Sequence, residues 1–93
     1  MKEINWSEEK NEALKANKER GSISFEDCRK AILLGDILDV LQNTVSGREH
    51  QQIFVLKIQN YAYAVPYVEN EHEIFLKTIY PSRALTSKYL RKS

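Results

Sequence analysis

The chain of 93 residues predicts a single α+β domain in which two N-terminal helices pack on an antiparallel sheet of about four strands and a basic helix ends the chain. Three observations predict this class. Two helical patterns come first, alternating apolar patterns follow them, and Gly and Pro residues mark the joints. Strands grouped after helices favour an α+β layered fold with the helices on one face of the sheet, and the length suits one modest core.

The N-terminus predicts a short extended stretch and then a surface helix. The stretch is Ile4 to Trp6, and Ser7 is a suitable N-cap for the helix that follows. Two glutamates in the first turn suit the positive end of the helix dipole. We expect this helix to run to about Lys18 and to lie on the surface, because it has few apolar residues, with Trp6 and Leu14 as its anchors.

A second helix, of about ten residues, is marked at both ends. Ser24 begins a capping-box pattern that Asp27 completes, and Gly35 fits the left-handed position that ends a helix. Cys28 falls at an apolar position of this helix, where a free cysteine acts as a small hydrophobe. Neither this lone cysteine nor the two histidines lie in a cluster with metal-ligand spacing. We therefore expect no internal disulfide, no metal and no other cofactor.

Residues 36–80 predict about four strands. Gln59 and Asn60 fit a tight turn between the second and the third. Because Pro66 lacks a backbone N–H, the third strand should carry a bulge or an exposed edge there. The predicted strands are Asp36 to Leu41, Ile53 to Gln59, Tyr61 to Val68 and Ile74 to Tyr80.

The C-terminal part predicts a short basic helix. Pro81 is permitted in its first turn, and Leu85, Tyr89 and Leu90 should face inward. Residues 77–93 hold five Lys or Arg and no acid, whereas the preceding residues have a net charge of −4. Such separation usually means that a polyanion or an acidic partner meets the basic end. The alternative is a solvated helix that is basic because the helix dipole favours cations at its C-terminus.

The same composition bears on the cellular location. No apolar run approaches the roughly 20 residues that span a bilayer. The N-terminus lacks the long apolar segment of a secretory signal. We therefore expect a cytoplasmic protein with no membrane partner.

Three stretches of the chain resemble one family. Ile4 to Asn11 is similar to its opening, an aromatic and a small polar residue before a helix rich in Lys and Asn. Gly21 to Asp27 resembles its Gly-Val-Ser-Phe-Glu-Glu, and Ile79 to Ala84 resembles its Ile-Ser-Ala-Arg-Lys-Ala. The family is the BrnT kind of bacterial type II toxin, within the RelE-like ribonuclease superfamily, and the resemblance extends from Ile4 to Leu90. A second RelE-like group of small uncharacterised domains resembles Ile23 to Asp36 about as well.

The resemblance implies a RelE-like fold and a metal-independent endoribonuclease that inhibits translation by cleaving RNA, either free or on the ribosome. Cleavage through the 2′-hydroxyl requires a base, an acid and cations for the charge that develops on phosphorus. Arg83 is the expected transition-state clamp, since a guanidinium grips phosphate bidentately. The other candidate catalytic residues are Lys77, Lys57, Tyr80 and His50, and the candidate RNA-binding residues are Lys88, Arg91, Ser82 and Arg48.

Several candidates also have a purely structural interpretation. Arg83 could be a surface arginine at a helix start, and Lys77 could be an edge lysine that discourages strand pairing. Tyr80, at a strand end, could belong to the core. Two positions depart from the family pattern: Gln52 and Ala84 stand where cations are usual. They support an alternative function, a non-catalytic RelE-like module that binds protein or RNA.

The expected protein partner is a cognate antitoxin encoded by an adjacent gene. Toxins that resemble this chain are usually encoded beside the protein that blocks them. The basic C-terminal residues offer a surface for an acidic segment of that partner, which should cover Arg83 and Lys88.

Overall fold

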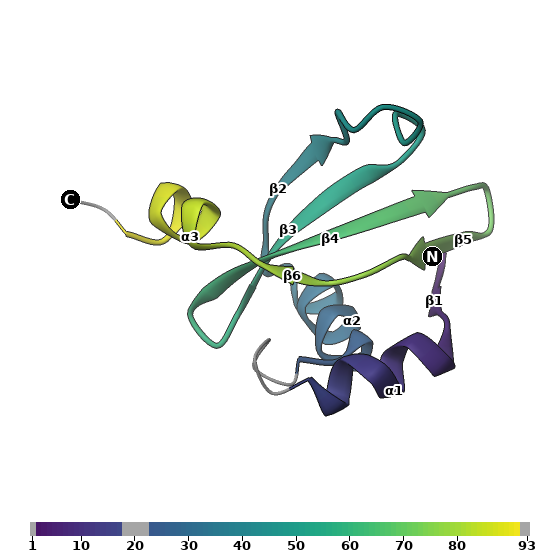
Figure 1. Ribbon diagram of the computed structural model, residues 1–93, viewed down its shortest axis with the longest axis horizontal. Helices are drawn as coiled ribbons and strands as arrows, with labels where there is room; N and C mark the ends of the chain where they lie inside the picture. The colour runs from purple at the N-terminus through teal and green to yellow at the C-terminus, as the bar shows by residue number, and fades with distance from the viewer. Residues whose placement is uncertain (1, 18–22, 92–93) are drawn as a thin grey trace.

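The computed structural model describes residues 2–17 and 23–91 and consists of one mixed sheet with three helices (Figure 1). The helices are α1 (Glu8–Ala16), α2 (Phe25–Leu34) and α3 (Arg83–Tyr89). The strands are β1 (Glu3–Trp6), β2 (Ile37–Gln42), β3 (Gln52–Ile58), β4 (Tyr61–Glu69), β5 (Glu73–Leu76) and β6 (Tyr80–Pro81). The coarse α+β class predicted from the sequence is confirmed.

The sheet has the order β1-β5-β4-β3-β2, and β6 also pairs with β4. Strands β2 to β5 form an antiparallel meander. The tight turn between β3 and β4 is confirmed, with positive φ angles of 54° at Gln59 and 62° at Asn60. Such a pair of left-handed residues is typical of the two-residue hairpin turn whose twist matches the strands.

The prediction of a purely antiparallel sheet of about four strands is wrong in one respect: β1 joins the sheet as a parallel neighbour of β5. From the sequence, Ile4 to Trp6 is predicted only as a short extended stretch before α1. A parallel pair needs a long crossover connection, and here α1, α2 and three strands separate the two along the chain. Four residues with no turn signal beside them give no indication of such a distant partner.

The last predicted strand, Ile74 to Tyr80, is interrupted. The structure has β5 and β6 with residues 77–79 between them in irregular conformation. Between the pairs Tyr67–Leu76 and Ala64–Tyr80, two residues of β4 face three residues of the neighbouring segment. Pro66 is one of those two, and its carbonyl accepts the Lys77 N–H at 2.8 Å. The irregularity expected at Pro66 therefore lies in the segment opposite, while β4 itself stays a central strand.

The helices α1 and α2 cover one face of the sheet and form the core with it. Both N-caps are confirmed: Ser7 Oγ accepts the Lys10 N–H, and Ser24 with Asp27 forms the capping box. Gly35 ends α2 with φ of 79°. The core cluster consists of Leu14, Ile23, Phe25, Cys28, Ala31, Phe54, Leu56, Tyr63, Val65, Tyr67, Leu76 and Ile79.

The first helix is fixed by residues at its two ends and one polar residue in its middle. Trp6 stacks on Phe25 with ring centroids 5.8 Å apart, and Leu14 is buried, so both predicted anchors are confirmed. Asn11 is also fully buried, and its Oδ1 accepts the Phe25 N–H at 2.8 Å. The helix ends at Ala16, and the predicted end at Lys18 lies outside the described residues.

The third helix lies on the opposite face, so the prediction that all helices share one face is wrong. Thr86 Oγ1 accepts the Ala62 N–H at 2.9 Å, and Tyr89 donates to Asp39. Phe54 and Leu56 point into the core that α1 and α2 cover, so Val55 between them points to the opposite face of the sheet. Asp39 pairs with Val55 and lies on that same opposite face. Both Val55 and Ala62 are fully buried. The face of the sheet that carries Val55 is thus covered in part by α3.

The start of α3 also differs from the prediction. Pro81 belongs to β6, and Ser82 is the N-cap, with its Oγ accepting the Leu85 N–H at 3.1 Å. Thr86 is the buried residue of the helix, whereas Leu85 and Tyr89 are half-buried. A threonine serves here because its hydroxyl satisfies a buried backbone N–H. None of the helices that the structure describes is long and apolar enough to cross a membrane.

Candidate functional site

A cleft of about 450 Å³ lies where the loop between β2 and β3 meets the interrupted segment 77–80. We call it the cationic cleft. Three of the lining side chains carry a positive charge, one is a histidine, and none is acidic. The lining residues are Lys10, Gly47, Arg48, His50, Gln51, Pro66, Lys77, Thr78 and Tyr80.

The Pro66 irregularity positions one side of the cationic cleft. A regular ladder would continue β5 past Leu76, but the extra residue opposite Pro66 takes Lys77 and Thr78 out of the regular pairing. Lys77 is exposed, and its Nζ lies 5.4 Å from the centre of the Phe75 ring. This cation–π contact leaves the charge of the ammonium unneutralised.

The loop between β2 and β3 forms the other side and is built by its own hydrogen bonds. The Arg48 N–H donates to the Val45 carbonyl and the Gln51 N–H to the Arg48 carbonyl, both at 2.9 Å. Buried Asn43 closes the loop, since its Oδ1 accepts the Val45 N–H at 3.0 Å. Gly47 takes a left-handed φ of 83°, which a side chain would strain. Arg48 and His50 are therefore presented from an ordered turn.

Tyr80 and Lys10 complete the cleft from two further elements. Tyr80 pairs with Ala64 in the sheet and is 43% exposed, so the interpretation of Tyr80 as a core residue is wrong. Lys10 comes from α1, on the polar side of a helix whose inward positions are Asn11 and Leu14. Lys10 is not predicted from the sequence, because a lysine on a solvated helix face carries no signal of what lies next to it in space.

The structure brings together four of the nine residues that the sequence nominated: Arg48, His50, Lys77 and Tyr80. They come from segments about 30 residues apart in the chain. Lys57 does not line this cleft. Ile53 is the β3 residue that pairs with Pro66, and Lys57 lies four residues further along β3, a distance of about 13 Å. There it lines a different hollow with the end of α2.

The remaining nominated residues belong to α3 or follow it. Ser82 is occupied as the N-cap of that helix, and Arg83 is its exposed first residue. Lys88 Nζ lies 5.2 Å from the centre of the Tyr89 ring, and Arg91 is exposed just beyond the helix. None of these four is among the lining residues of the cationic cleft.

Arg83, Lys88 and Arg91 form what we call the α3 surface, and an acid, Asp39, lies beside it. The hydrogen bond from Tyr89 lowers the pKa of Asp39, and the same bond raises the pKa of Tyr89. Lys88 also lowers the pKa of the Asp39 carboxyl through its charge. Asp39 comes from β2, so the positive potential of α3 is reduced by a neighbour that the charge count along the chain does not reveal.

Thiol and metal chemistry find little support in the described part of the chain. Cys28 is fully buried in the core, and burial raises the pKa of its thiol to about 12. It is therefore the small hydrophobe that the sequence predicted. Residues 2–17 and 23–91 contain no group of three or more His, Cys, Asp or Glu side chains that could hold a metal ion.

Comparisons of the chain with protein-family models, with curated proteins and with solved structures find no match.

Proposed function

We propose that the cationic cleft binds RNA and that the protein is the toxin of a type II toxin-antitoxin system, a metal-independent endoribonuclease. The observation that carries this proposal is the convergence of Lys10, Arg48 and Lys77, from three separate segments, on one cleft without a carboxylate. Like charges brought together at a surface repel one another unless an anion lies between them. A phosphodiester backbone is a suitable anion, because it presents a charge at each nucleotide.

The other lining groups fit the chemistry of RNA cleavage. The Tyr80 ring is exposed beside the cations, where an unstacked base can lie against it. An imidazole, which His50 supplies, is the side chain best suited to moving protons near neutral pH. In the proposed reaction a base takes the proton of the 2′-hydroxyl, that oxygen attacks phosphorus, and an acid protonates the departing 5′-oxygen. The cations stabilise the charge that develops on the phosphoryl oxygens.

Purified protein incubated with RNA, with and without EDTA, tests the proposal. We expect cleavage that survives the chelator and is lost in the Arg48→Ala and Lys77→Ala variants. Lys30→Ala is the matched control, since Lys30 is exposed on α2 and does not line the cleft. Intact RNA at micromolar protein, with free and ribosome-bound substrates both tried, would count against the nuclease.

A second candidate is a module that binds RNA or protein without cleaving it. Gln52 favours this candidate, because it stands where the resembling family has an arginine and its Oε1 accepts the Tyr67 hydroxyl at 3.1 Å. That side chain serves the sheet and supplies no charge to a reaction. Unrestrained expression separates the two candidates: growth arrest supports the nuclease, and normal growth together with retained RNA binding supports the module.

The proposed protein partner is an antitoxin encoded beside this chain, which covers α3. The exposed cations Arg83, Lys88 and Arg91 give its acidic segment a surface outside the cationic cleft. Association should be fastest at low salt, because the contact is partly electrostatic. Co-expression of the two proteins followed by size-exclusion chromatography tests this. Separate elution, or an affinity unchanged by charge reversal at the three cations, would contradict it.

A further inference from the structure

The free edge of β1 is open to another strand. β1 ends the sheet and pairs only with β5, and the Glu3 N–H donates to the His72 carbonyl at 3.1 Å. Because the bonding direction alternates along a strand, the N–H and carbonyl of Ile4 point away from β5. They are the groups that a further strand would use.

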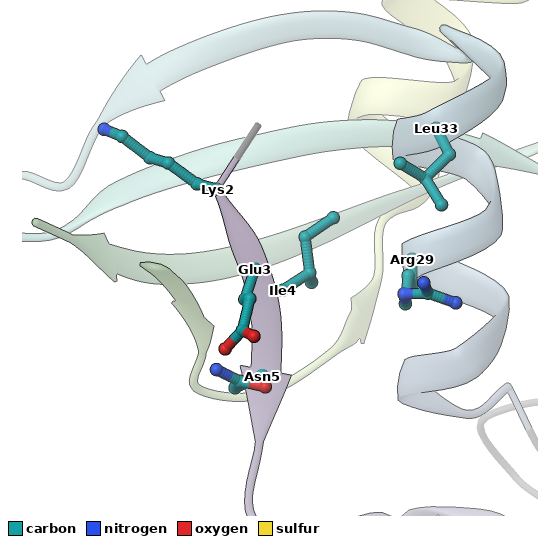
Figure 2. Close-up of a pocket in the computed structure, with 6 residues that line it drawn as sticks. All are labelled: Lys2, Glu3, Ile4, Asn5, Arg29 and Leu33. Carbon is teal, nitrogen blue, oxygen red and sulfur yellow. The ribbon is translucent and has the colours of Figure 1, made fainter. Parts of the chain in front are cut away.

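Beside this edge lies a hollow between β1 and α2. Figure 2 shows these two elements side by side. The hollow adjoins an apolar hollow of about 330 Å³, which shares Lys2, Ile4 and Leu33 with it and is also lined by Ile32 and Ile74. Leu33 is 47% exposed although it faces this hollow. An apolar hollow next to an open strand edge is the arrangement by which strand addition obtains affinity from the backbone and specificity from alternate side chains.

The opposite edge of the sheet is less receptive, because one of its outward N–H groups is already bonded. Asn43 donates its N–H to Gln51 across the β2–β3 pair, so the Val40 N–H points away from β3 by the same alternation. Asp39 Oδ1 accepts that N–H at 2.8 Å. A charged side chain that occupies an edge N–H is one of the devices that prevent strand pairing. Of the two edges, β1 is the more receptive.

The charges around the hollow define the partner. Lys2 is paired with Glu69 at 2.7 Å, whereas Arg29 forms no ion pair with any residue that the structure describes. In Figure 2 the Arg29 guanidinium lies on the α2 side and the Glu3 carboxylate lies beside Asn5 on β1. Leu33 and Arg29 are one helical turn apart, about 5–6 Å, which is close to the spacing of alternate residues in a strand.

We propose that an extended segment of a partner protein binds along β1 by strand addition. One of its apolar side chains enters the β1–α2 hollow, a carboxylate two residues away meets Arg29, and a basic neighbour faces Glu3. An extended segment is a better occupant than a second copy of this chain, because the edge of β1, about 13 Å long, is short for a dimer interface, which buries about 1,200 Å² or more, whereas a segment can also fill the hollow. The site is separate from the cationic cleft and does not depend on RNA cleavage.

Selection from a random dodecapeptide display library against the purified protein tests the proposal. We expect enriched peptides with an apolar residue, an acid two positions away and a base beside the apolar residue. Their affinity should fall about tenfold or more in Leu33→Lys and in Arg29→Glu. The matched controls Leu34→Lys and Lys30→Glu alter exposed neighbours on α2 that do not line the hollow, and they should change the affinity less than about twofold.

Ile4→Pro tests the backbone part, and Ile4→Ala is its control, because Ile4 also lines the hollow with its side chain. Ile4→Pro removes an N–H that faces the free edge and leaves the ladder to β5 intact, so the fold should tolerate it while the peptide loses a partner. In titrations followed by amide NMR, the Ile4, Arg29 and Leu33 signals of the wild type should move. Three results would overturn the proposal: no enrichment, peptides that bind Leu33→Lys as tightly as the wild type, or shifts of the same amides on concentrating the protein alone.

Discussion

The cationic cleft and the α3 surface both carry three cations, but they are assembled in different ways. In α3 the cations are neighbours in the sequence, and Asp39 lies beside them. In the cleft they come from α1, from the β2–β3 loop and from the segment after β5, and no acid lines the space. A run of charge along a chain is easily noticed, yet the cluster of cations without an acid is built by residues that only the fold brings together.

The two surfaces also depend on different contacts. Pro66 and the hydrogen bonds of the β2–β3 loop hold the cleft, while one buried threonine and one tyrosine hold α3. Changes to one surface should therefore leave the other intact. Variants that alter only one of the two surfaces can therefore show which of them binds RNA.

His50→Ala should lower the rate of RNA cleavage by about 100-fold or more, because loss of a group that transfers protons typically costs 10²–10⁴ in rate. RNA affinity should change little, since the cations remain. His72→Ala is the control: this histidine is exposed in the turn between β4 and β5, away from the cleft. Single-turnover cleavage of a labelled RNA measures both. Equal loss in the two variants would separate His50 from the chemistry.

Asn11→Ala should lower the free energy of unfolding by about 2–3 kcal/mol, because it leaves the buried Phe25 N–H without a partner. The hydrogen bond from Asn11 is also the main cause of the lowered pKa of Glu26, so that pKa should rise toward its ordinary value. Urea unfolding and carboxyl NMR titration measure the two effects. RNA affinity should fall as well, since Lys10 sits on the helix that Asn11 fixes.

Thr86→Val should lower the free energy of unfolding by about 1–2 kcal/mol, because the Ala62 N–H then has no acceptor. The matched control Ser87→Ala changes an exposed hydroxyl of the same helix and should have almost no effect. RNA affinity should stay at the wild-type value in both variants. A large loss of RNA affinity in Thr86→Val would show that α3 belongs to the RNA site.

The smallest effect concerns pH. The hydrogen bond from Tyr89 lowers the pKa of Asp39 in the folded protein below its value in the unfolded chain. The Asp39 carboxylate therefore stabilises the fold at a pH above the unfolded-state pKa. This stabilisation is lost as the pH falls through the folded-state pKa. The wild type should therefore lose stability below about pH 4, the usual range of an aspartate. In Tyr89→Phe this part of the pH dependence should be weaker. Thermal unfolding between pH 2 and pH 6 provides the comparison.

Much of the fold could be predicted from the sequence, because the signals are local. Ser24 with Asp27, Gly35, and the Gln59–Asn60 turn each state their conformation within a few residues. The β1–β5 pairing could not be predicted, since four residues do not identify a partner about 70 positions away. The second face covered by α3 was hidden for a similar reason: Thr86 gives no apolar signal, and its burial follows from one backbone hydrogen bond.

The candidate site divides in the same way. Residue type and charge nominated Arg48, His50, Lys77 and Tyr80, and the structure places all four in one cleft. Sequence reasoning could not exclude Lys57 or find Lys10, because both decisions depend on which end of a strand or face of a helix meets the cleft. The resemblance to BrnT-like toxins pointed to Arg83 through a motif at the start of α3, whereas the proposed RNA site is the cationic cleft, which Arg83 does not line.

The salt dependence of RNA affinity tests the central claim most directly. Single-stranded RNA binding should be measured from low to moderate salt for the wild type, for Lys10, Arg48 and Lys77 all changed to Ala, and for Arg83, Lys88 and Arg91 all changed to Ala. Each phosphate contact contributes about 0.7 to the slope of log K against log salt, so the cleft variant should lose about two units of slope. The α3 variant should keep the wild-type slope. A full slope in the cleft variant, with the loss confined to the α3 variant, would contradict the account.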